Sequence, residues 1–201
     1  MVRDDHAFAG INGDFFPFTG APLNLMVREG ELLAAPYQSK ADPEAKRATF
    51  GWGQDFSGFG FGKMVASIQA GSLEDKVDGW NVESLPDQVV VNTPAVGLVR
   101  STAPNTYVVV KTSDAHWTPN SVVKGTVTEV GTDVIQRKVD ENSFILVATG
   151  THRQRFTNLQ EGDAVTVQTR VEGFDWSKVT NVIGGGPVLV RNRQIFIDWA
   201  D

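Results

Sequence analysis

The 201-residue sequence contains no cysteine. This absence excludes disulfide bonds and thiolate metal sites, and it leaves the redox compartment open because a chain without thiols tolerates either environment. No run approaches the roughly 20 apolar residues of a membrane-spanning helix. The first residues also lack the charged-then-apolar order of a signal peptide. The sequence therefore predicts a soluble chain that does not insert into a membrane.

Basic residues are also scarce, with 18 Lys and Arg against 24 Asp and Glu, which gives a net charge of −6. This balance disfavours nucleic acid or an anionic membrane as the main partner. The three histidines, His6, His116 and His152, are isolated, and such residues are more often surface residues than ligands or bases. No metal and no cofactor are predicted. A calcium ion held by Asp14 and backbone oxygens is the alternative left open.

Long helical periodicity is missing, whereas glycines and short β-branched runs between polar turns are abundant. The chain is therefore predicted to be mainly β, with a mixed or antiparallel sheet. Residues 25–33 are predicted to form a hairpin with Glu29 and Gly30 at its turn, and residues 41–47 a short helix. Within the single unit 1–201, residues 83–178 are predicted to form an inserted small β barrel or sandwich.

Residues 50–62 alternate aromatic side chains with glycines. One interpretation is an aromatic platform, whose flat side chains would stack on the apolar face of a sugar ring. The other is a core strand, in which large side chains fill the interior and glycines let a neighbouring strand approach closely. The general preference of phenylalanine for burial favours the core interpretation.

Two strands end in glycine-rich turns, one at each end of the chain. Asn12, Gly13 and Asp14 place a carboxamide and a carboxylate at a strand end, although Asn-Gly is also a strong hairpin signal. Residues 184–186 are three consecutive glycines, which suit a close backbone approach or a nest of N–H groups for a phosphate or carboxylate oxygen. A wide turn or bulge is the alternative for these glycines.

Taken together, these segments resemble the phosphodiester glycosidase family, in particular its bacterial branch. The residues that carry the resemblance are Asn12-Gly13-Asp14-Phe15-Phe16, Gly20-Ala21-Pro22, Val27-Arg28-Glu29-Gly30-Glu31-Leu32 and Ile183-Gly184-Gly185-Gly186-Pro187-Val188-Leu189-Val190. The chain departs from the family pattern at Leu23-Asn24, where a glycine is usual, and at Arg191-Asn192-Arg193, where Asp-Gly is common. The family also continues beyond this point into a helix-containing segment, so the chain is expected to be the first part of a catalytic domain that is α+β when complete.

The resemblance implies a hydrolase that cleaves the bond between the anomeric carbon of a sugar, such as N-acetylglucosamine, and a phosphate oxygen. Asp14 and Asn12 are then the expected catalytic residues, and Gly13 with Gly184, Gly185 and Gly186 would bind the substrate and its phosphate. The expected partner is a small-molecule or glycan phosphodiester, and the family setting is extracellular or at the cell envelope. A non-catalytic carbohydrate- or cell-wall-binding β module is the alternative function.

Overall fold

The computed structural model describes residues 22, 24–35, 47–101, 103–185, 190–191 and 193–195. Asn12, Gly13, Asp14 and Gly186 lie outside these residues, as do residues 41–46 of the expected helix. The mainly β prediction is confirmed, because strands form most of the described chain and the α-helix is five residues long.

Residues 25–33 form the predicted hairpin, with strands on either side of a turn at Glu29 and Gly30. Both turn residues have positive φ, 52° and 84°, which glycine adopts at no steric cost. Along the chain, the elements are β1 (Met26–Arg28), β2 (Glu31–Ala34), β3 (Arg47–Trp52), β4 (Ser57–Ala70), β5 (Leu73–Lys76), β6 (Gly79–Trp80), β7 (Val89–Asn92), η1 (Pro94–Val96), β8 (Leu98–Ser101), β9 (Asn105–Thr112), β10 (Val122–Thr132), β11 (Ile135–Lys138), β12 (Ser143–Thr149), η2 (Gly150–His152), α1 (Arg153–Thr157), β13 (Ala164–Glu172), β14 (Asn181–Gly184), β15 (Val190–Arg191) and β16 (Gln194–Ile195).

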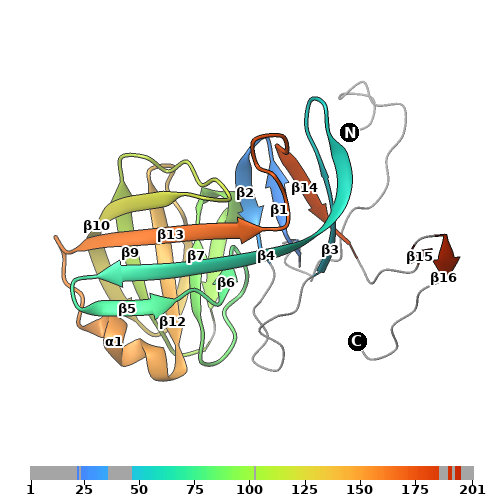
Figure 1. Ribbon diagram of the computed structural model, residues 1–201. Coiled ribbons are helices and arrows are strands. Elements are labelled where there is room, and N and C mark those ends of the chain that lie inside the picture. The colour runs from blue at the N-terminus through green and yellow to red at the C-terminus, as the bar shows by residue number, and fades with distance from the viewer. Residues whose placement is uncertain are drawn as a thin grey trace.

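The main sheet has the strand order β2-β1-β14-β3-β4-β13-β10-β9-β12-β7-β6, with β5 also paired to β4 (Figure 1). All of these pairs are antiparallel except β6 with β7. The two ends of the path meet at a single bridge between Ala35 and Trp80, so the sheet is a nearly closed barrel. Because β5 and β6 belong to this same sheet, the barrel includes strands that precede residue 83, the predicted start of the inserted unit.

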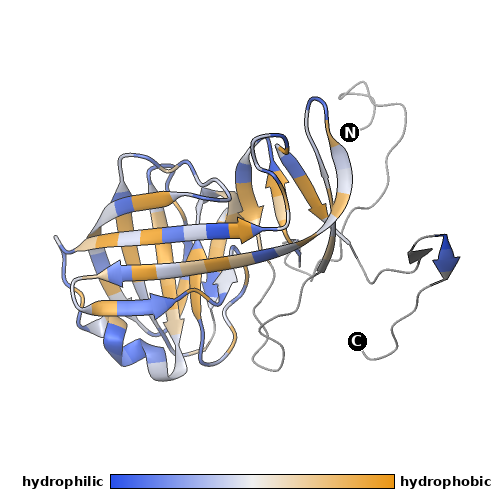
Figure 2. Cartoon of the chain, viewed as in Figure 1, coloured by the Kyte–Doolittle hydropathy of each residue, from blue (hydrophilic) through white to orange (hydrophobic). Residues whose placement is uncertain are grey.

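Apolar and polar residues alternate along several barrel strands (Figure 2), and the buried apolar residues form one continuous core. At its centre the ring of Trp117 contacts Trp80 and Phe144 edge-on, with centroids 5.0 and 5.2 Å apart. A second, smaller cluster lies where the β8–β11 ribbon packs on β9 and β12; its members are Val99, Val109, Ile135, Val139, Ile145 and Val147. The barrel is therefore covered by a second apolar layer on the side of the ribbon.

The core interpretation of the aromatic and glycine stretch is wrong for its aromatic residues, because Phe59 is 88% exposed. The register explains this result, since Phe50 pairs with Phe59 while Gly51 pairs with Gly58. The rings of Phe50, Trp52, Phe59 and Phe61 therefore share one face of the β3–β4 pair, and the glycines of these two strands share the other. The glycine face is the packed one, because a Cβ on Gly51 would lie 2.6 Å from the ring of Phe174. Close approach at the glycines is thus confirmed, although the rings lie on the opposite face.

Candidate functional site

Strand β14 contains the described part of the last motif of the resemblance, and it lies next to the β1–β2 hairpin, which contains another of these motifs. It lies between β1 and β3, with Val27 opposite Val182 and Gly184 opposite Thr49 (Figure 1). Residues separated by about 150 positions in the chain are therefore neighbours in one sheet.

Three hydrogen bonds besides the strand ladder join the hairpin region to β14. The N–H of Gly30 donates to the carbonyl of Thr180 at 2.7 Å, and the N–H of Glu29 donates to Asn181 Oδ1 at 3.0 Å. Before the hairpin, Asn24 Nδ2 donates to the carbonyl of Gly185 at 3.4 Å. The hairpin turn and both ends of β14 are thus held in one rigid unit.

Gly184 and Gly185 are the predicted phosphate-binding residues that the structure describes. Gly184 is buried as the last residue of β14. The N–H of Gly185 donates to the carbonyl of Ala48 at 2.9 Å, so the sheet already uses this amide. A Cβ on Gly185 would meet only the Ala48 oxygen, at an ordinary 3.5 Å, among the atoms of the described structure. Local packing therefore gives no reason for glycine at position 185, and an anion would need the neighbouring amides.

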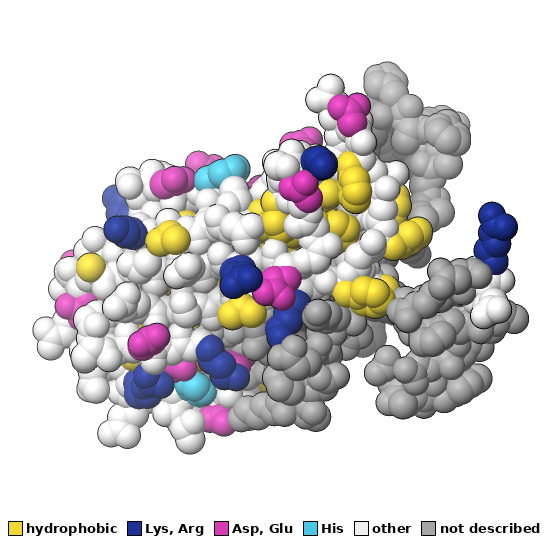
Figure 3. All heavy atoms as spheres, in the orientation of Figure 1, with side chains coloured by type: hydrophobic (Ala, Val, Ile, Leu, Met, Phe, Trp, Pro, Cys, Tyr) yellow, Lys and Arg dark blue, Asp and Glu magenta, His cyan; other side chains and the backbone are white. Residues whose placement is uncertain are grey.

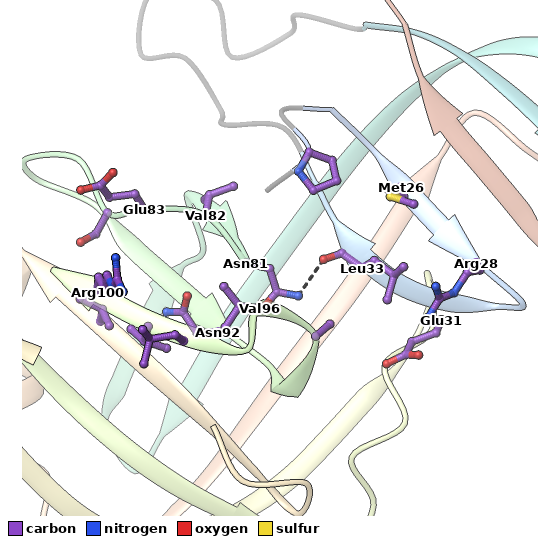
Figure 4. Close-up of a pocket in the computed structure, with 16 residues that line it drawn as sticks. Met26, Arg28, Glu31, Leu33, Asn81, Val82, Glu83, Asn92, Val96 and Arg100 are labelled. Carbon is purple, nitrogen blue, oxygen red and sulfur yellow. Dashed lines mark hydrogen bonds between the residues drawn. The ribbon is translucent and has the colours of Figure 1, made fainter. Parts of the chain in front are cut away.

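A hollow of about 760 Å³ lies between the β1–β2 hairpin and the adjacent corner of the barrel (Figure 4). Its size falls within the roughly 300–1,000 Å³ typical of small-ligand sites. The hairpin side contributes Met26, Arg28, Glu31 and Leu33, and the barrel side contributes Asn81, Val82, Glu83, Ser84, Asn92, Ala95, Val96, Leu98, Val99, Arg100 and Val147. Sequence reasoning missed this site, although Asn92 ends the apolar strand β7 and Asn81 directly follows β6.

Asn81 closes the inner end of this hollow. Its φ is 55°, and its buried side chain joins the hairpin to the barrel. Nδ2 donates to the carbonyl of Leu33 at 2.7 Å and to Thr93 Oγ1 at 2.9 Å, and Oδ1 accepts from the N–H of Thr93 at 2.7 Å. This one amide therefore fixes the seam where β2 and β6 meet.

Two ionic clusters lie elsewhere in the barrel. Glu129 accepts from Arg137 at 2.7 Å and from the hydroxyl of Tyr107 at 2.8 Å. The hydrogen bond from Arg137, followed by that from Tyr107, lowers the pKa of Glu129. The hydrogen bond to Glu129 and burial raise the pKa of Tyr107. Both shifts follow from partners that hold the carboxylate ionised and the phenol protonated.

The second cluster surrounds Asp75, which is almost fully buried. His152 Nδ1 lies 2.7 Å and Arg155 Nη1 2.9 Å from the same carboxylate oxygen of Asp75. His152 is therefore a partly buried partner of a carboxylate, whereas His116 is exposed as predicted. The described residues hold no group of three or more His, Asp or Glu side chains arranged for a metal ion. In the same part of the chain, none of the helices has the length and apolar character needed to cross a bilayer.

No protein-family model and no curated protein sequence matches the chain. Among solved structures, the chain resembles a hypothetical protein from Synechocystis, with a TM-score of 0.76 and 19% identity over 98% of this chain and 35% of that one. It also resembles a protein from Burkholderia pseudomallei described as "Putative exported protein", with a TM-score of 0.70 and 15% identity over 92% of this chain and 42% of that one. The chain thus spans well under half the length of these structures, and the likeness is one of fold.

Proposed function

We propose that this chain is part of a hydrolase that cleaves a sugar-1-phosphodiester into a free sugar and a phosphomonoester. The observation that supports the proposal is the pairing of the β1–β2 hairpin with β14, because these two distant segments carry the described part of the resemblance to the phosphodiester glycosidases. A set of motifs that the fold assembles in one place is better support than the same motifs scattered over the surface.

The chemistry requires a carboxylate close to a sugar ring that becomes positively charged in the transition state. In this proposal Asp14 stabilises that charge, attacks the anomeric carbon or activates water, while Asn12 orients Asp14 or binds sugar hydroxyls. The amides near Gly13, Gly184 and Gly186 hold the phosphate oxygens as negative charge develops on the leaving group. The phosphate is already a good leaving group, so binding it matters more than protonating it.

The test is release of free sugar from N-acetylglucosamine 1-phosphodiesters by the full-length protein. Asp14→Asn and Asn12→Ala are expected to lower kcat/KM by at least about a hundredfold, as loss of a charge-stabilising or acid–base group does. Asp5→Asn is the matched control, since it removes a nearby carboxylate outside every motif. Unchanged rates in both motif variants would remove these residues from the mechanism.

An extracellular or cell-envelope setting is part of the same proposal. It is consistent with the description of the Burkholderia pseudomallei structure as "Putative exported protein". Fractionation of the native cells with an antibody to the chain tests it, and recovery with cytoplasmic marker enzymes would contradict it.

A non-catalytic carbohydrate-binding module is the second candidate, and the aromatic face of β3 and β4 favours it. Phe50 stacks on Trp52 with ring centroids 5.9 Å apart, and Phe59 lies 5.2 Å from Phe50 on the next strand. Exposed flat rings of this kind suit the apolar face of a sugar. In Figure 3 hydrophobic side chains gather over the β1, β14, β3 and β4 end of the molecule.

Pull-down on insoluble chitin, cellulose and peptidoglycan tests this second candidate. Phe59→Ser is expected to reduce retention severalfold, because stacking is worth about 1–3 kcal/mol per ring. Val65→Ser, on the same strand and 45% exposed, is the control for a lost apolar side chain. Equal retention of both variants would show that the aromatic face does not bind the glycan.

A further inference from the structure

The hollow between the hairpin and the barrel has the features of a binding site of its own. We propose that it binds a neutral saccharide of one or two rings. Gly184 and Gly185 do not line this hollow, and the inference stands whether or not the chain hydrolyses a phosphodiester. It rests on three observations: how the hollow is formed, which polar groups it leaves open, and how its charges balance.

The hollow exists because β2 and β6 meet at one point and then diverge. The Ala35–Trp80 bridge is their single backbone pairing in the described chain. Two backbone groups of β2 nevertheless already have partners outside the hairpin: the N–H of Leu32 donates to the carbonyl of Trp117 at 2.7 Å, and the carbonyl of Leu33 accepts from Asn81. A peptide strand would find few backbone partners there, so side chains must provide recognition. This favours a small ligand over an added strand.

Asn92 supplies an open polar group on the barrel side of the hollow (Figure 4). Its side chain is 2% exposed, and Nδ2 donates to the carbonyl of Ile145 at a long 3.4 Å. Among the described residues, this bond to Ile145 is the one hydrogen bond of the Asn92 side chain, and none is made by Oδ1. A buried carboxamide with an unused acceptor gains a full hydrogen bond from a ligand hydroxyl, because little side-chain entropy remains to be lost.

Among the described residues that line the hollow, the positive and negative side chains are equal in number. Arg28 and Glu31 occupy the hairpin side, and Glu83 and Arg100 occupy the barrel side, so each wall carries one charge of each sign (Figure 4). A strongly anionic or cationic ligand would meet a charge of its own sign on each wall, and this repulsion disfavours it. Hydroxyl groups both donate and accept, so they can use guanidinium and carboxylate groups together.

Apolar side chains on both walls line the rest of the hollow: Met26, Leu33, Val82, Val96, Leu98, Val99 and Val147. A sugar ring presents an apolar face and a polar perimeter, which matches an apolar floor bordered by amides and charges. The volume of about 760 Å³ leaves room for one or two rings.

The experiment is an NMR titration of the full chain with cellobiose and with N,N′-diacetylchitobiose, following backbone amides. Saturable shifts are expected at the amides that line the hollow, including those of Leu33, Asn92 and Val96. Ala95→Trp places a large ring into the hollow from an exposed position and is expected to weaken binding at least about tenfold. Arg100→Gln is expected to weaken it severalfold by removing donors from one wall.

Two controls make the outcome decisive. Val122→Trp adds the same ring at a position that is 56% exposed and not part of the hollow, so it is expected to bind like the unmodified chain. Glucose 1-phosphate is expected to bind no tighter than glucose. The absence of localised shifts with both disaccharides, or unchanged binding by Ala95→Trp, would overturn the site. At least tenfold tighter binding of the phosphorylated sugar, measured from the shifts of the amides that line the hollow, would overturn the assignment of the hollow to a neutral ligand.

Discussion

Replacing Asn81 by alanine is expected to be among the most damaging single changes in the barrel. The substitution leaves the N–H of Thr93 and the carbonyl of Leu33 without the partners they now have at 2.7 Å. Each buried group left unsatisfied costs about 1–3 kcal/mol. Alanine also tolerates φ near 55° less well than asparagine, which adds about 1 kcal/mol. The free energy of unfolding is therefore expected to fall by about 3–7 kcal/mol.

Asn81→Gly separates the two contributions, because glycine adopts positive φ freely but makes neither side-chain hydrogen bond. It is expected to be about 1 kcal/mol more stable than Asn81→Ala. Urea unfolding followed by tryptophan fluorescence measures both values, provided that the slope with denaturant is unchanged. If Asn81→Ala lowered the free energy of unfolding by less than about 1 kcal/mol, the conclusion that this amide holds β2 and β6 together would be refuted. Equal stability of the two variants would refute the backbone contribution.

Two further predictions concern a carboxylate and a glycine. Because hydrogen bonds lower the pKa of Glu129 below its ordinary 4.5, the folded state gains stability above that pH and loses it as pH falls through the lowered value. Glu129→Gln should make the free energy of unfolding depend less on pH below about pH 4.5. The change should be under ~1 kcal/mol, because the side chains of Glu129 and Arg137 are both more than a third exposed, and an unchanged pH profile would contradict this. Gly53→Ala should cost more than 2 kcal/mol in thermal unfolding, because its Cβ would press on the backbone carbonyl of Lys178. Gly71→Ala, strained at φ 58° but in open space, should cost about 1 kcal/mol, and the reverse order would contradict the packing argument.

The hairpin and the mainly β character could be predicted because they depend on local signals, namely a Glu-Gly turn and β-branched runs. The orientation of the aromatic face could not, because alternation indicates which residues share a face and not which face is buried. Phe174, more than 110 positions away, covers the glycines and leaves Phe59 exposed. The hollow was also out of reach, since Leu33 lies on β2 and Asn81 directly follows β6, and a single bridge joins the ends of these strands. Long-range pairing decides such features, and no local pattern encodes it.

From the same long-range pairing we expect that residues 83–178, the predicted inserted unit, cannot be removed without disturbing the rest of the chain. Strand β4 runs without interruption from the β3 pair into the barrel, where β13 pairs with residues 63–69. Excising residues 83–178 and joining the ends with a short Gly-Ser linker would expose Met64 and Ile68, which are buried within the common core. The remainder is therefore expected to lose cooperative unfolding and the dispersed amide spectrum of the intact chain. A sharp thermal transition in the excised protein would show instead that the hairpin sheet carries a sufficient core of its own.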